Sequence, residues 1–128
     1  MDAKGHLVLI VEDNERNLKL ARDLLGVTGF RTLAAGTAEE GLVLARQHRP
    51  DLVLMDVRLP GMSGVEALAA LRADPATAGL IVVAFTASVT SAERAQVATA
   101  GFDGFLAKPI SVRDFPEQVR RYCQRGAA

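Results

Sequence analysis

The chain has 128 residues, 49% of them hydrophobic, and its 15 Lys and Arg residues balance its 15 Asp and Glu residues. This length fits one compact domain, and a net charge of zero disfavours binding to a nucleic-acid backbone. The longest apolar run, Leu80 to Phe85, is far shorter than the roughly 18 residues of a membrane span. With a single cysteine and no secretory signal, the sequence favours a cytoplasmic protein with no membrane partner.

The first half of the chain alternates short apolar runs with longer amphipathic stretches. Leu7–Val11 is rich in β-branched residues, which is typical of a strand buried on both faces. Asn14–Leu25 has apolar residues at helical spacing and is predicted as a helix with an asparagine N-cap. Phe30–Ala34 is the second predicted strand. A threonine followed three residues later by a glutamate then forms a capping box, which opens a helix at Thr37–Gln47.

The second half of the chain continues the alternation. The remaining strands are predicted at Leu52–Met55, Leu80–Phe85 and Phe102–Ala107. The remaining helices are predicted at Gly64–Ala73, Thr90–Ala100 and Ser111–Gln124, the last two counted from their N-caps.

Strands that alternate regularly with helices are typical of a parallel sheet covered by helices on both faces. We predict an α/β fold of the flavodoxin-like (βα)5 class, a doubly wound five-stranded sheet in the order 2-1-3-4-5, as a single domain over residues 1–128. Right-handed crossovers place the carboxyl ends of all five strands at one edge of the sheet.

Polar residues follow four of these strands directly. Glu12 and Asp13 follow the first strand, Asp56 the third, Thr86 the fourth and Lys108 the fifth. Three carboxylates and one ammonium group give this edge a formal charge of minus two, which one divalent cation would neutralise. Because all the candidate ligands are oxygens on a shallow edge, Mg²⁺ is the expected metal cofactor.

Taken together, these residues resemble the receiver domain of two-component response regulators, the CheY-like family, over essentially the whole chain. The similar segments are Val11-Glu12-Asp13-Asn14, Leu54 to Gly64 around Asp56, Phe85-Thr86-Ala87 and Ala107-Lys108-Pro109. Val11 to Lys19 and Lys108 to Val112 are most similar to DivK-type single-domain regulators of bacterial cell division.

The resemblance implies a phosphoacceptor. Asp56 would receive a phosphoryl group from a sensor histidine kinase or a histidine phosphotransfer protein and form an acyl phosphate. Asp13, Asp56 and the backbone carbonyl of Arg58 would bind Mg²⁺, while Glu12 acts mainly through water. The chain would then be no enzyme in the ordinary sense, although it assists its own phosphorylation and dephosphorylation.

The resemblance also implies a switch. Lys108 would pair with Asp56 at rest and with a phosphoryl oxygen after transfer, and the Thr86 hydroxyl would donate to another oxygen. Phe105 would turn from exposed to buried. Downstream proteins would bind the face of the fourth helix, fifth strand and fifth helix, and the kinase would approach the first helix. The Lys108–Pro109 bond is expected to be cis.

Four alternatives compete with this function. An aspartyl-phosphate phosphatase needs a second acid two residues after its nucleophile, and Arg58 stands there. Flavin binding is disfavoured because Glu12 and Asp13 would repel its phosphate. An unphosphorylated pseudo-receiver that only binds partners, and a receiver domain of a larger hybrid histidine kinase, both remain open.

Two further residues bear on how long the phosphoryl group lasts. Arg58 and Ser88 are expected to flank the path of a hydrolytic water to Asp56. Ser88 is too short to reach far, and Arg58 cannot act as a base because its guanidinium stays protonated. The long stem of Arg58 could also cover the acyl phosphate. The sequence therefore predicts slow self-dephosphorylation.

Overall fold

The computed structural model describes residues 6–86, 90–108 and 110–127. Its strands are β1 (Leu7–Val11), β2 (Arg31–Ala35), β3 (Leu52–Met55), β4 (Val82–Thr86) and β5 (Gly104–Ala107). Its helices are α1 (Glu15–Val27), α2 (Ala38–His48), α3 (Gly64–Ala73), α4 (Ser91–Ala100) and α5 (Phe115–Ala127). All neighbouring strands are parallel, in the order β2-β1-β3-β4-β5. The predicted fold class and strand order are confirmed.

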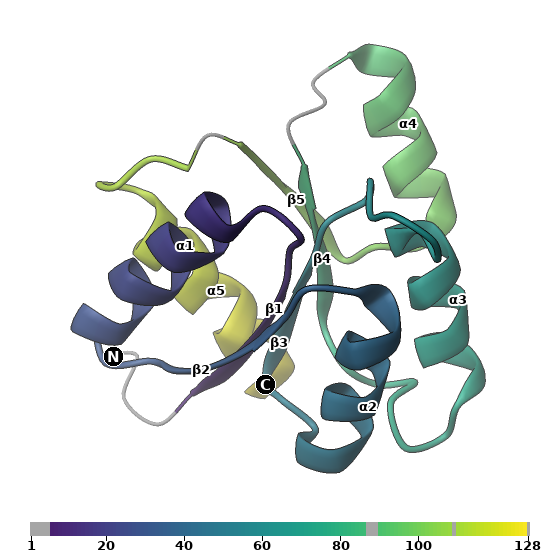
Figure 1. Ribbon diagram of the computed structural model, residues 1–128, viewed down its shortest axis with the longest axis horizontal. Helices are drawn as coiled ribbons and strands as arrows, with labels where there is room; N and C mark the ends of the chain where they lie inside the picture. Colours follow the sequence, from purple (N-terminus) through teal and green to yellow (C-terminus); the bar gives the residue numbers. More distant parts are fainter. Residues whose placement is uncertain (1–5, 87–89, 109, 128) are drawn as a thin grey trace.

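Two helical layers cover the sheet, with α1 and α5 on one face and α2, α3 and α4 on the other (Figure 1). Each strand contributes side chains to the hydrophobic core on both faces of the sheet, because successive side chains point to opposite faces. In β1, Leu9 and Val11 pack toward α2 and α3, whereas Val8 and Ile10 pack toward α1 and α5. All four are fully buried, which explains the continuous apolar run that predicted this strand.

The helix N-caps follow their predicted chemistry. The side chain of Asn14 accepts a hydrogen bond of 3.0 Å from the backbone N–H of Asn17, and that of Thr37 accepts one of 3.1 Å from Glu40. Ser111 likewise accepts one of 3.2 Å from the N–H of Asp114. Helix α5 nevertheless begins only at Phe115 and continues to Ala127, so the predicted end at Gln124 was wrong.

Strand β4 begins two residues later than predicted and includes the threonine at its end. The reason is local hydrogen bonding around Leu80. The N–H of Leu80 donates to the carbonyl oxygen of Thr77 at 3.1 Å, and its own carbonyl accepts a bond of 2.6 Å from the Arg72 guanidinium. Leu80 therefore belongs to the loop after α3.

Strand β5 also begins two residues later than predicted. The Asp103 carboxylate accepts hydrogen bonds from the Arg72 guanidinium at 2.9 Å and from the Val82 N–H at 2.8 Å. These contacts fix the turn before β5, while Phe102 packs in the core. Strand β2 is displaced by one residue from its predicted bounds.

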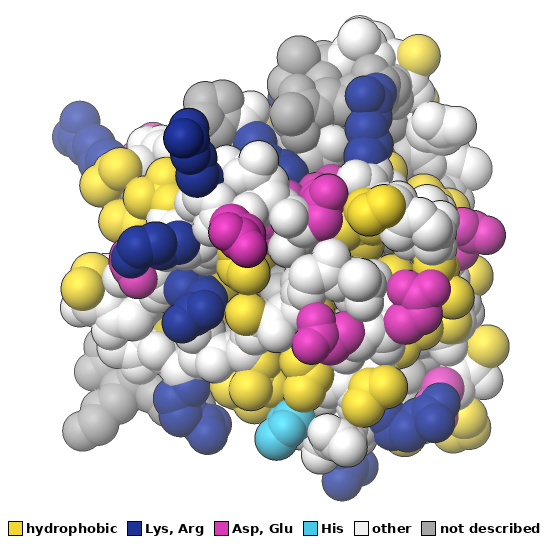
Figure 2. Space-filling model, viewed as in Figure 1, with side chains coloured by type: hydrophobic (Ala, Val, Ile, Leu, Met, Phe, Trp, Pro, Cys, Tyr) yellow, Lys and Arg dark blue, Asp and Glu magenta, His cyan; other side chains and the backbone are white. Residues whose placement is uncertain are grey.

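The surface carries charges of both signs, with Lys and Arg side chains occurring among Asp and Glu on the visible face (Figure 2). This agrees with the net charge of zero. Among the described residues, no helix is long and apolar enough to cross a membrane. Pro109, with its predicted cis bond, and Ser88 lie outside the described residues.

Candidate functional site

The sheet order brings the polar strand ends together. Strand β3 lies between β1 and β4, so Asp56 follows β3 beside the end of β1. The N–H of Asp56 donates to the carbonyl oxygen of Val11 at 3.0 Å, immediately before Glu12. At the other side, the N–H of Lys108 donates to the carbonyl oxygen of Thr86 at 2.9 Å. The structure thus places the predicted site residues at one edge.

Lys108 is bonded to two acids at the centre of this edge. Its Nζ donates to Asp56 Oδ2 at 3.0 Å and to Glu12 Oε1 at 2.5 Å. The side chains of Lys108, Glu12 and Asp56 are only 11%, 1% and 6% exposed. The pairing of Lys108 with Asp56 is as predicted, whereas the direct contact with Glu12 was not foreseen.

The second oxygen of each buried carboxylate is bonded to the backbone. Glu12 Oε2 accepts a hydrogen bond of 3.0 Å from the N–H of Asn14, and Asp56 Oδ1 accepts one of 3.0 Å from the N–H of Arg58. Hydrogen bonds to ionised groups are stronger than neutral ones. Both carboxylates are therefore oriented before any ligand arrives.

Burial and charge oppose each other in this cluster. Burial raises the pKa of Glu12, and its hydrogen bond to Lys108 only partly offsets this. Burial lowers the pKa of Lys108, but hydrogen bonds to Glu12 and Asp56 outweigh burial and leave its pKa raised. Lys108 is therefore a permanent positive charge at neutral pH.

The three acids suit a divalent metal ion. Glu12, Asp13 and Asp56 each offer a carboxylate oxygen, and these oxygens lie within 4.8 Å of one another. Asp13 is exposed, whereas the other two are buried, so the group opens to solvent on one side. Such hard oxygen donors at an open edge fit Mg²⁺, which retains several waters when bound. The role predicted for the Arg58 carbonyl remains a prediction.

Gly64 is a site residue that sequence reasoning missed. A Cβ atom there would lie 2.2 Å from the carbonyl oxygen of Asp56 and 2.8 Å from the Cα of Val57. The N–H of Gly64 donates to the carbonyl oxygen of Val57 at 3.1 Å. The first turn of α3 thus packs on the Asp56 backbone, and only glycine fits. The available signal was a glycine at the first position of a predicted helix.

The two predicted switch residues share one small cavity. Thr86 is buried at the end of β4, and Phe105 on β5 is half-buried. The cavity measures about 30 Å³ and is lined by Val57, Arg58, Val65, Thr86, Gln96, Val97 and Phe105. On its other side, Phe105 contacts Arg94, whose guanidinium carbon lies 5.0 Å from the ring centroid. This contact with α4 was not foreseen.

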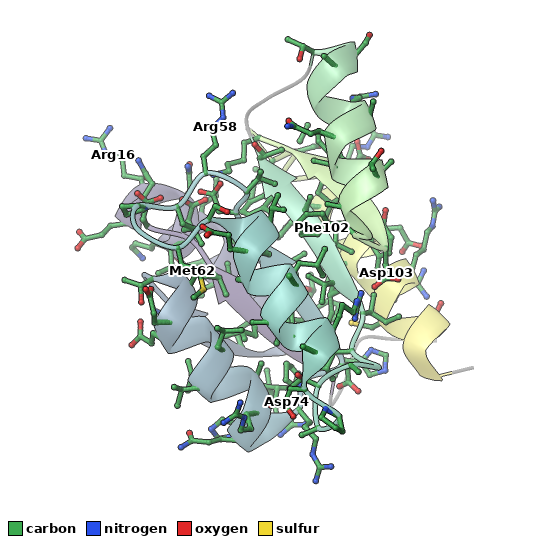
Figure 3. The ribbon with its side chains drawn as sticks, turned by 90° about the vertical axis from the view of Figure 1, so that its right-hand side faces the viewer. Arg16, Arg58, Met62, Asp74, Phe102 and Asp103 are labelled. Carbon is green, nitrogen blue, oxygen red and sulfur yellow. The ribbon has the colours of Figure 1, made fainter. Side chains whose placement is uncertain are left out.

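Arg58 does not enclose the site in this structure. Its side chain is exposed, and Figure 3 shows it projecting away from the loop after β3, as Arg16 does from the start of α1. The predicted shielding of the acyl phosphate therefore stays a prediction.

Comparison with known proteins gives a consistent result. The sequence model of the family described as the response regulator receiver domain matches residues 8–120. The polar-differentiation response regulators DivK of Brucella anthropi and Brucella ovis are 42% and 41% identical to this chain over 115 residues, which is 90% of the chain and 94% of each relative.

Solved structures agree with this result. A CheY-like receiver domain protein from Methanospirillum hungatei has a TM-score of 0.83 at 28% identity, covering 95% of this chain and 96% of that one. The receiver domain of the sensor histidine kinase PA1611 from Pseudomonas aeruginosa has a TM-score of 0.86 at 28% identity, covering 94% and 98%. That structure has a magnesium ion coordinated in its active-site cleft.

Proposed function

Because the chain belongs to the response regulator receiver family, we propose that it accepts a phosphoryl group on the side chain of Asp56. Receiver domains are phosphoacceptor switches of two-component phosphorelays. The observation that carries the assignment is the position of Asp56, a buried carboxylate bonded to Lys108 at 3.0 Å and grouped with Glu12 and Asp13. The donor is the phosphohistidine of a sensor histidine kinase or histidine phosphotransfer protein.

The chemistry is a phosphoryl transfer from nitrogen to oxygen. A carboxylate oxygen of Asp56 attacks the phosphorus, the P–N bond breaks, and the histidine leaves with its electron pair and takes up a proton. Lys108 then exchanges its hydrogen bond with Asp56 for one with a phosphoryl oxygen, and the Thr86 hydroxyl donates to another. Asp13, Asp56 and the Arg58 carbonyl would hold Mg²⁺, which would supply positive charge against the phosphoryl oxygens.

The domain assists these reactions itself. Lys108 and the backbone N–H of Arg58 orient the attacking carboxylate, so a small donor such as acetyl phosphate can replace the kinase. Glu12 would act on the bound metal mainly through water. The same groups assist hydrolysis of the acyl phosphate.

The positions of Phe105 and Asp56 indicate two protein-binding surfaces. Phe105 lies on β5 between α4 and α5, so we assign downstream protein targets to the α4–β5–α5 face. The kinase reaches Asp56 from beside α1. The DivK relatives are named as regulators of polar differentiation, and we infer a comparable role in bacterial cell-division control, in the cytoplasm.

Phosphorylation by acetyl phosphate with Mg²⁺ tests the proposal. Intact-mass analysis should show one added phosphoryl group on the parent and none on Asp56→Asn, which keeps the shape but lacks the nucleophilic oxygen. Asp23→Asn is the matched control, because Asp23 is exposed on α1 and pairs only with a neighbouring lysine in the bonds seen here. A labelled Asp56→Asn protein, or an unlabelled parent, would contradict the proposal; an unlabelled parent would indicate a pseudo-receiver.

A further inference from the structure

Phe105 separates two spaces in the fold. On the inner side lies the cavity of about 30 Å³ that it shares with Thr86. On the outer side lies an open groove of about 500 Å³ between α4 and α5. Its lining includes Arg94 of α4, Phe105 of β5 and Tyr122 of α5. The half-buried ring can therefore be stabilised from either side.

Arg94 contacts the ring from the outer side. Its guanidinium carbon lies 5.0 Å from the centre of the Phe105 ring, which is within the range of a cation–π interaction. Arg94 lines the outer groove and is absent from the lining of the inner cavity. The attraction therefore acts on the ring in its present position, from the side that faces the groove.

The inner cavity does not accept the ring in its present form. A space of about 30 Å³ holds about one water molecule, which is far smaller than a phenyl group. Inward movement of Phe105 requires the residues that line the cavity, Thr86 among them, to make room. The position of the ring is thus tied to the Asp56 site through Thr86, and to the α4 surface through Arg94.

We propose that Arg94 is a positioning residue for Phe105, which holds the ring on the groove side in the unphosphorylated protein. This inference rests on the proposed function, in which phosphorylation of Asp56 favours the inward ring. Arg94 then sets how strongly phosphorylation must favour that state. At a partly exposed site, a cation–π contact shifts a two-state equilibrium by about two- to fivefold.

Nuclear magnetic resonance of Phe105 tests the inference. The ring and amide signals would be recorded in the parent, with and without beryllofluoride and Mg²⁺, to define the two end positions. In Arg94→Met, which keeps the length of the stem but removes the charge, the signals of the free protein should move toward the beryllofluoride position. The apparent Kd for beryllofluoride should fall by about two- to fivefold, because less free energy is spent on moving the ring.

Two further variants separate the cation–π contact from other effects. Arg94→Lys keeps a cation and should restore much of the parent behaviour. Arg121→Met removes a positive charge from α5, where Arg121 Nε lies 3.3 Å from Glu117 Oε2. Arg121 lines a neighbouring pocket with Phe105, whereas the cation over the ring is Arg94, so this change should not move the Phe105 signals toward the beryllofluoride position. Thermal unfolding of each variant verifies that the fold is intact.

The outcomes distinguish this inference from the proposed function. Parent-like signals and Kd in Arg94→Met, or equal shifts in Arg121→Met, would overturn the role of Arg94 and leave the switch standing. If Phe105 does not move in the parent on beryllofluoride binding, the switch and the role of Arg94 both fail. Phosphorylation of Asp56 by acetyl phosphate would still stand in that case.

Discussion

Lys108 and Glu12 are 96 positions apart in the chain, yet Lys108 Nζ lies 2.5 Å from Glu12 Oε1. The same nitrogen donates a hydrogen bond to Asp56 Oδ2, so one buried ammonium group is the counter-charge of two buried carboxylates. A buried charge left without its partner is strongly destabilising, whereas the paired cluster is tolerated. This arrangement governs both the stability of the protein and its response to metal.

Replacing Lys108 by methionine should destabilise the fold by about 3–5 kcal/mol at neutral pH, because two buried carboxylates lose their counter-charge. Urea unfolding followed by circular dichroism measures this change. Lys19→Met is the control, since Lys19 forms an exposed pair with Asp23 and should change stability by less than about 1 kcal/mol. Equal losses in the two variants would contradict the role given to Lys108.

The destabilisation of Lys108→Met should depend on pH. Burial raises the pKa of Glu12, and Lys108 opposes this rise most strongly, with a smaller contribution from the hydrogen bond donated by the Asn14 N–H. Without the lysine the pKa rises further, so the folded state binds a proton more tightly than the unfolded state. The free energy of unfolding contributed by that proton is present in full below the pKa of Glu12 in the unfolded chain, and is lost as the pH rises through the pKa of Glu12 in the folded state. The deficit relative to the parent should therefore shrink as the pH is lowered from 7 toward 5, and a constant deficit would count against this reasoning.

Glu12→Gln should destabilise the metal-free protein by about 1–3 kcal/mol, because its amide has one acceptor oxygen for the two donors, Lys108 Nζ and the Asn14 N–H, that the Glu12 carboxylate accepts. The same change should reduce the rise in Tm that Mg²⁺ produces, since one acid of the metal group is lost. Thermal unfolding with and without magnesium chloride measures both effects. Glu39→Gln, an exposed change on α2, should alter neither. A Glu12→Gln protein as stable as the parent, with an undiminished Mg²⁺ effect, would refute the prediction.

Gly64→Ala should destabilise the fold by about 1–3 kcal/mol, because its Cβ would lie 2.2 Å from the Asp56 carbonyl oxygen. It should also slow phosphorylation by acetyl phosphate, since α3 or the Asp56 loop must shift. Gly26→Ala in α1 is the matched control: its Cβ would meet no atom within 4 Å, and the change should be neutral or stabilising. If Gly64→Ala matches the parent in stability and in phosphorylation, the Asp56 loop can shift without measurable cost and the prediction is wrong.

Arg58 is expected to slow the loss of the phosphoryl group once Asp56 is modified. In the present structure its side chain is exposed, but its N–H already bonds to Asp56 Oδ1 at 3.0 Å, so the stem begins beside the acceptor. Decay of the phosphorylated protein should be faster in Arg58→Ala and Arg58→Asn, because water gains an open path. Decay that is equal or slower in both variants would mean that the arginine shields nothing.

The alternation of strands and helices was sufficient to predict the flavodoxin-like class, whose strand order is 2-1-3-4-5. It was also sufficient to predict the meeting of Glu12, Asp56 and Lys108, because parallel strands present their carboxyl ends at one edge. It was insufficient for the starts of β4 and β5. These depend on the Arg72–Asp103 pair, which joins residues 31 positions apart and has no periodic signal. Local propensity cannot report such a contact.

Contacts across elements were missed for a related reason. The stacking of Arg94 on Phe105 depends on how α4 lies against β5, and the close approach of Gly64 to Asp56 depends on where the loop after β3 returns. Neither is specified by residue spacing within one element. Both adjoin the site, so the sequence identified the reactive groups better than the residues that position them.

The central claim is that Asp56 carries the phosphoryl group, and locating the modified residue tests it most directly. Borohydride reduces an aspartyl phosphate to homoserine, and tandem mass spectrometry of the digested protein then identifies the reduced position. After treatment with acetyl phosphate and Mg²⁺, homoserine should be found at position 56 alone. Homoserine at Asp13 or elsewhere, or none in a protein that has gained a phosphoryl group, would contradict the assignment.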